Sequence, residues 1–221
     1  MHVHPPKPLH GWRVFSGEVG IIVVGVLIAL AAEQMVGWAH ERGDIAQLRG
    51  ALRSELADSR ARWENIRAQD PCTEQRLDAL DKWVASAPTG ATLSDGYGPF
   101  LWNMHSSAWD LAKTSPVAEH VPLKERLTYA SLYAAIDNWR QFITEESQNS
   151  RKLTDLLATA DQPENRRQIR FYLMEARSML RRRRLNYDYF FNRFDELGIG
   201  PDTSQLTIRV DPHRLCNPLK T

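Results

Sequence analysis

An uninterrupted apolar segment near the N-terminus constrains this chain more than any other feature of its sequence. Val19–Ala32 contains fourteen residues without a charge or a proline, and no lysine or arginine occurs between Arg13 and Arg42. Trp12 and Trp38 flank the segment, 26 residues apart. That separation is about 39 Å along a helix, which approaches the thickness of a bilayer with its headgroups. The pattern is typical of a membrane-spanning helix.

The polar residues around this segment also suit a membrane interface. Glu18 and Glu33 bound the apolar run, so their carboxylates can reach the two interfaces instead of the bilayer centre. Trp12 and Trp38 would then form the two aromatic belts. We predict a transmembrane anchor over residues 14–39.

Two other interpretations of the segment stay open. Fourteen apolar residues also suit a buried core helix or the apolar region of a signal peptide, and Ala29-Leu30-Ala31 resembles a cleavage site. Against a signal peptide, Glu18 stands where a basic region should precede the apolar run.

Gly25 and Ala29 have the small-xxx-small spacing that allows two helices to pack closely, which is a weak signal for a dimer.

Charge gives little information about the orientation of the anchor. The basic residues before and after the segment are nearly balanced, so the positive-inside rule does not decide. A short N-terminal tail and a long C-terminal domain suit a signal-anchor. We therefore expect residues 1–13 in the cytoplasm and the domain on the other side of the membrane.

The remaining composition excludes several classes of function. The net charge of +1 gives no global attraction to nucleic acid. Metal and catalytic signatures such as a P-loop, His-Glu-x-x-His or Gly-x-Ser-x-Gly do not occur. His213-x-x-Cys216 supplies only half of a metal site. The sequence predicts no enzyme, no cofactor, no metal and no nucleic-acid partner.

Apolar residues at helical spacing predict five helices after the anchor. A break is expected at Asp70-Pro71, with aspartate as the N-cap of the next helix, and Gly198 is expected to end the last one. The expected helices cover residues 40–69, 71–87, 99–114, 122–160 and 163–197.

These helices predict an all-α fold. The last two are joined by a three-residue turn and must therefore be antiparallel neighbours. The first helix makes a third rod, and the two short helices together make a broken fourth. We expect an up-down four-helix bundle over residues 40–197, followed by a short extended tail over residues 198–221 in which Leu206, Ile208 and Val210 alternate with polar residues.

The anchor and two later segments carry a resemblance to a protein family. The residues concerned are Gly17–Leu30, Ala32-Glu33-Gln34, Ala108-Trp109-Asp110-Leu111-Ala112 and Leu132-Tyr133. They resemble an uncharacterised family of bacterial single-span membrane proteins with a short N-terminal tail and a helical extracytoplasmic domain. The resemblance implies the bacterial cytoplasmic (inner) membrane, with the domain in the periplasm, and it implies no activity.

Four consecutive arginines form the most unusual local feature. Arg181, Arg182, Arg183 and Arg184 lie within a helix that has nine arginines and three acids between Glu164 and Arg193. A solvated face paired with acids such as Glu145 and Glu146 is one interpretation. The functional interpretation is one anion-binding surface for lipid headgroups or an acidic partner.

The two cysteines, Cys72 and Cys216, have two open interpretations. They are either buried thiols or, in an oxidising compartment, one long-range disulfide. If the first helix ends near Cys72, the tail must return about 45 Å, the length of a 30-residue helix, to bring Cys216 there. The eighteen residues after Gly198 can extend about 60 Å, so a tail that runs along the bundle can reach.

The functional expectation is a non-enzymatic, single-pass membrane protein whose periplasmic bundle binds a partner protein, a second copy or an anionic envelope component such as a lipid. The alternative is an accessory subunit whose transmembrane helix packs against other subunits of a membrane complex. An enzyme with a composite, motif-free active site is the third possibility.

Overall fold

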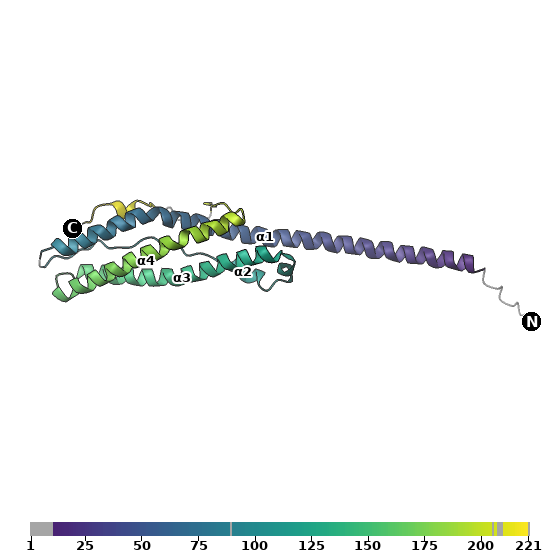
Figure 1. Ribbon diagram of the computed structural model, residues 1–221, viewed down its shortest axis with the longest axis horizontal. Coiled ribbons are helices and arrows are strands. Elements are labelled where there is room, and N and C mark those ends of the chain that lie inside the picture. Colours follow the sequence, from purple (N-terminus) through teal and green to yellow (C-terminus); the bar gives the residue numbers. More distant parts are fainter. Residues whose placement is uncertain (1–10, 89, 205, 207–209, 221) are drawn as a thin grey trace, which may run out of the picture. The chain divides into compact units, whose positions relative to one another are not determined.

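The computed structural model describes residues 11–88, 90–204, 206 and 210–220, and no β-strand occurs among them. The chain forms two compact units, which are described separately: residues up to Gln47, and residues from Leu48 onward. The all-α prediction is therefore confirmed. The α-helices are α1 (Trp12–Ser86), α2 (Ser107–Ala112), α3 (Leu123–Ala158) and α4 (Pro163–Glu196), with 3₁₀ turns at Pro116–His120 and Arg214–Cys216 (Figure 1).

The first unit consists of the N-terminal part of α1. Every side chain described between Gly11 and His40 is exposed, including the large apolar ones such as Ile21 and Leu27. Among the described residues, α1 is the one helix that is long and apolar enough to cross a membrane. An apolar helix that buries none of its side chains in the protein needs another apolar environment.

In the second unit, α1, α3 and α4 pack around two clusters of buried side chains. The first cluster is rich in aromatic residues, and the ring of Trp63 stacks on Phe190 with the ring centroids 4.4 Å apart. The second cluster is mostly leucine, with Leu77 and Leu80 from α1, Leu157 from α3 and Leu173 from α4. The helical members of both clusters follow the spacing that the sequence shows, and the segment between α1 and α2 adds Trp102 to the first cluster and Tyr97 to the second.

The expected helix break at Asp70-Pro71 is wrong, because α1 continues through Pro71 to Ser86. A proline inside a helix removes one backbone hydrogen bond and normally costs about 3 kcal/mol. Here Thr73 donates to the carbonyl oxygen of Gln69 at 3.0 Å, and the buried side chain of Asp70 is held by α4. Packing on both sides of the proline therefore stabilises the continuous helix.

The helix expected over residues 99–114 is also wrong, since residues 91–106 are extended and α2 is one short helix after them. Side chains supply hydrogen-bond partners to the backbone of this segment. The Gln69 amide donates to the Phe100 carbonyl oxygen and accepts from the Phe100 N–H, and the Trp139 indole donates to the Trp102 carbonyl oxygen. The buried side chains of Tyr97 and Trp102 fix it further. An extended segment therefore stands where a fourth rod was expected.

The turn between α3 and α4 and the end of α4 agree with the sequence. Gly198 has a positive φ of 60°, which is the conformation that favours glycine after a helix. Its N–H bonds to the Asp195 carbonyl oxygen, and the Ile199 N–H bonds to that of Phe194. These two bonds form a Schellman motif, and its apolar contact is supplied by the buried side chains of Phe194 and Ile199.

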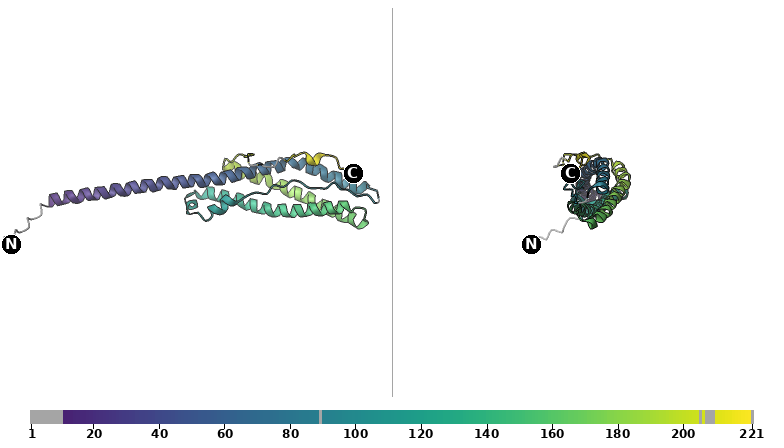
Figure 2. Two further views of the ribbon diagram at one scale, coloured as in Figure 1. Left: turned by 180° about the vertical axis from the view of Figure 1, so that it is seen from behind. Right: turned by 90° about the vertical axis from the view of Figure 1, so that its left-hand side faces the viewer.

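After Gly198 the tail runs beside α1 within the second unit (Figure 2). Arg53 of α1 donates to the carbonyl oxygens of Leu197 and Gly198, and the Asp202 N–H donates to that of Ala57. Leu206 and Val210 pack against the aromatic cluster, as the alternating pattern predicts. Ile208 lies outside the described residues.

Candidate binding site on helices α3 and α4

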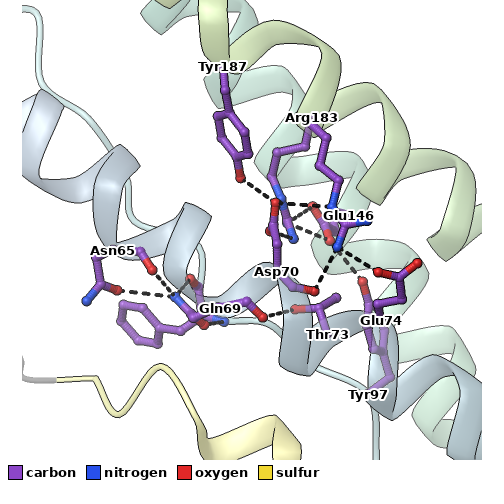
Figure 3. Close-up of polar contacts among 11 residues, drawn as sticks. Asn65, Gln69, Asp70, Thr73, Glu74, Tyr97, Glu146, Arg183 and Tyr187 are labelled. Atoms are coloured by element: carbon purple, nitrogen blue, oxygen red, sulfur yellow. Dashed lines mark hydrogen bonds and ion pairs between the residues drawn. The ribbon is translucent and has the colours of Figure 1, made fainter. Parts of the chain in front are cut away.

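A buried group of charged side chains joins α1, α3 and α4 (Figure 3). Arg183 is only 2% exposed, and its guanidinium lies between two carboxylates. It donates to Asp70 Oδ1 from Nε at 3.0 Å and from Nη2 at 2.6 Å, and from Nη1 to both oxygens of Glu146 at 3.0 and 3.1 Å. Charge-assisted hydrogen bonds to two carboxylates compensate the cost of burying the charges.

Two tyrosines complete this buried network. Tyr97, from the extended segment, donates to Glu146 at 3.0 Å, and Tyr187 donates to Asp70 at 2.9 Å. Burial raises the pKa of Glu146, although Arg183 opposes that shift. Burial also raises the pKa of both tyrosine hydroxyls, and the adjacent carboxylates add to the rise at each hydroxyl. The network thus holds four segments of the chain together.

The expectation that all four arginines of the run form one anion-binding surface is corrected by these contacts. Arg183 is inside the protein, because it falls in phase with the apolar stripe of α4. Arg182 pairs with Glu145 at 2.6 Å, and Arg184 pairs with Glu74 at 2.9 Å. Arg181 alone is exposed without an ion pair among the described residues. The sequence therefore identifies an unusual cluster, but only part of it faces solvent.

A groove of about 680 Å³ lies between α3 and α4, next to the buried network. Its aromatic lining includes Trp139, Phe142 and Phe190, and Arg182 lies over the Phe142 ring with 4.9 Å between the guanidinium carbon and the ring centroid. The amides of Asn138, Gln141 and Asn186 also line it. An aromatic lining with a few polar groups is the usual composition of a binding groove.

The outward face of α4 beside this groove is both basic and apolar. Phe171 is 52% exposed, Met174 57% and Leu185 78%, and Arg167, Arg170 and Arg181 are exposed among them. None of the three arginines makes an ion pair or a side-chain hydrogen bond within the described part of the chain. We call Arg167, Arg170, Phe171, Met174, Arg181 and Leu185 the α4 face. The apolar members of this face recur at helical spacing, but their exposure was not predicted from the sequence.

A second cavity, of about 590 Å³, lies at the other end of α3 from the α3–α4 turn. Leu48 and Leu52 of α1 and Leu123 and Leu127 of α3 contribute to its lining. No sequence signal identified it, because α2 and the following turn bring its walls together only in the folded chain.

The structure joins Cys72 to Cys216, with their sulfurs at disulfide distance and their Cα atoms 4.5 Å apart. Of the two interpretations of the cysteines, the structure therefore supports the long-range disulfide and not the free thiols. Its geometry differs from the expectation, because α1 continues beyond Cys72 to Ser86, so that Cys72 is not at the end of the helix. Arg53, where the tail begins, is nineteen residues from Cys72, about 29 Å along α1. The tail therefore covers less than the expected 45 Å.

His213 lies beside the disulfide, with its Nδ1 3.7 Å from the sulfur of Cys72. The two sulfurs and this nitrogen are close enough to ligate one ion. Sulfurs that are bonded to each other offer no thiolate, however, and thiolate is the form that binds zinc. The tail is also held by Arg76 of α1, which donates to the carbonyl oxygens of Leu215 and Asn217.

The residues predicted to contact a membrane all lie in the first unit. Apart from the backbone of its own helix, nothing lies within 4 Å of the place where a Cβ on Gly25 would stand, so its side of the helix is open. The Arg42 guanidinium carbon lies 3.7 Å from the centroid of the Trp38 ring. The residues that α1 exposes in this unit include Trp12, Glu18, Gly25, Ala29, Glu33 and Trp38.

No family model, curated protein or solved structure matches the chain.

Proposed function

We propose that this chain is a non-catalytic, single-pass protein of the bacterial inner membrane, with residues 14–39 as its anchor, residues 1–13 in the cytoplasm and the helical domain in the periplasm. The fully exposed apolar helix supports the anchor. The Cys72–Cys216 pairing supports export of the domain, because disulfides persist in oxidising compartments.

We propose further that the domain binds a partner protein through the α4 face and the adjoining α3–α4 groove. The observation that carries this proposal is the set of three unpaired arginines among three exposed apolar side chains. Unpaired charges steer an oppositely charged partner, and exposed apolar groups stabilise the complex once they are buried. A partner segment with acidic and apolar side chains fits this combination.

Site-specific photocrosslinking tests the binding site in the full-length protein in its native membrane. A benzoylphenylalanine replaces Ser178, which is exposed in the middle of the α4 face. We expect one discrete crosslinked protein. Reversing the charges of Arg167, Arg170 and Arg181 to glutamate should abolish that crosslink.

The matched control reverses the charges of Arg151 and Lys152, which are exposed on α3. This control should leave the crosslink at residue 178 unchanged. A crosslink that survives reversal of the α4 face, or one that forms only to lipid, contradicts a protein partner at this surface.

The open surface around Gly25 supports the alternative, an accessory subunit that packs its transmembrane helix against other subunits. Replacing Gly25 and Ala29 by leucine would block that packing. In this alternative, the two leucines abolish co-purification with the membrane partner, whereas the three charge reversals on the α4 face do not.

A further inference from the structure

Three of the most exposed leucines of the second unit gather at one end of it. Leu111 is 69% exposed, Leu123 63% and Leu127 61%. Leu111 belongs to α2, and Leu123 and Leu127 lie one turn apart at the start of α3. We call these three residues and Lys124 the base surface. Leucines exposed in one place indicate a contact with something apolar.

The second cavity shows that the base surface lies near the first residues of the second unit. Leu123 and Leu127 line the same cavity as Leu48 and Leu52, the first leucines of α1 in this unit. The base surface is therefore at the end of the domain where the chain arrives from the anchor. Leu48 is ten positions after Trp38 in α1, about 15 Å along the helix.

The charges around these leucines suit anionic headgroups. Asp110 is paired with Lys113, and Glu125 with Arg49 at 2.7 Å, so two of the nearby acids are already compensated. Lys124 is exposed, and neither Lys124 nor Arg126 makes an ion pair within the described chain.

Arg126 adds an independent observation. Its Nε–H is buried and has no hydrogen-bond acceptor among the described residues, and its side chain lines the cavity. A phosphate oxygen of a headgroup is an acceptor that satisfies this donor. Basic side chains next to apolar ones are the usual composition of a surface that lies in the membrane interface.

We propose that the base surface rests on the lipid bilayer: the three leucines enter the headgroup region, and Lys124 and Arg126 contact lipid phosphates. This proposal rests on the proposed anchor, which limits how far the surface can lie from the membrane. It goes beyond that function because it assigns the domain a fixed side toward the lipid. The α4 face then stays available to a partner protein.

A fluorescent reporter tests the contact in the full-length protein with its disulfide intact. The protein carries Leu127→Cys labelled with an environment-sensitive dye and is placed in nanodiscs that contain phosphatidylglycerol and a spin-labelled quencher lipid. The control is Ala158→Cys, which is exposed at the opposite end of α3, 31 residues or about 46 Å away. We expect a blue-shifted emission and strong quenching at position 127, and neither at position 158.

Three further variants separate the outcomes. Lys124→Glu should weaken the quenching at position 127, whereas Arg151→Glu should not. A reporter at Val24→Cys, within the anchor, should be quenched in every sample. If Val24 is quenched and Leu127 behaves like Ala158, or is shielded from both lipid and water by a second copy, the base surface does not contact lipid. If Val24 is not quenched either, the anchor is wrong and the base proposal fails with it.

Discussion

Arg183 of α4 donates two hydrogen bonds, at 2.6 and 3.0 Å, to the same carboxylate oxygen of Asp70, the residue that precedes the proline inside α1. The two residues are 113 positions apart in the sequence. This contact joins α1 to the helix that carries the α4 face. It also separates Arg183 from its neighbours in the arginine run, which face solvent.

We predict that Arg183→Gln lowers the free energy of unfolding by about 3–5 kcal/mol, because it leaves the buried carboxylates of Asp70 and Glu146 without their cation. The matched control, Arg181→Gln, should change it by less than about 0.5 kcal/mol, since Arg181 is exposed and unpaired. Urea denaturation of both variants measures the difference. Equal effects would show that the buried network does not determine stability.

The Cys72–Cys216 bond should stabilise the domain by constraining the unfolded chain. The sequence separation of 144 residues gives about 5 kcal/mol in the chain-entropy treatment. The double variant Cys72→Ser, Cys216→Ser should therefore unfold at much lower urea concentration than the oxidised protein. Adding a reductant should lower the stability of the wild type to that of the variant and should not affect the variant. A reductant effect of similar size on both proteins contradicts this assignment.

Replacing two glycines by alanine should have opposite effects on stability. Gly198 has a φ of 60°, so Gly198→Ala should destabilise the domain by about 1–2 kcal/mol. Gly50 lies inside α1 with nothing within 4 Å of a new Cβ, so Gly50→Ala should stabilise it by about 0.5–1 kcal/mol. Thermal unfolding gives the sign of each change, and a shift in the same direction for both variants would contradict the assigned backbone conformations.

Buried tyrosines should make the domain sensitive to alkaline pH. Burial raises the pKa of Tyr97, Tyr133 and Tyr187 above 10.0, and nearby carboxylates raise it further. The unfolded chain then loses these protons at lower pH than the native protein. Stability should therefore fall as the pH rises above 10, by up to about 1.4 kcal/mol per pH unit for each tyrosine.

Urea midpoints measured between pH 8 and pH 11 test this pH dependence. Tyr187→Phe removes one ionisable group and should make the alkaline loss of stability less steep. Tyr189→Phe, at an exposed position of the same helix, serves as the control and should leave the slope unchanged. A wild-type stability that does not change between pH 9 and pH 11 would contradict the assigned burial of the tyrosines.

The long helices could be predicted from the sequence because their apolar spacing is regular and their ends have strong local signals. The bounds of α3 and α4 differ from the expected ones by one or two residues, and Gly198 ends α4 as predicted. The break at Pro71 was wrong because packing on both sides of a proline outweighs its local cost. That packing involves residues far away in the sequence, which a local pattern does not report.

The site was harder to predict than the fold. The arginine run identified the correct part of α4, and the position of Arg183 on the apolar stripe was a signal that this residue is buried. Its partners Asp70 and Glu146 carry no local signal, since they meet Arg183 only in the folded chain. The extended segment around Phe100 was equally hidden, because the side chain of Gln69 holds its backbone.

The proposed function requires that residues 14–39 anchor a domain that lies in the periplasm. A pair of fusions after Thr221, one to alkaline phosphatase and one to green fluorescent protein, tests it in living cells. We expect high phosphatase activity in the membrane fraction and no fluorescence, because the phosphatase requires export for activity. A fluorescent fusion together with inactive phosphatase would contradict this orientation and place the domain in the cytoplasm. Active phosphatase that is recovered as a soluble protein, with a sequence beginning at Ala32, would contradict the anchor and show a cleaved signal peptide.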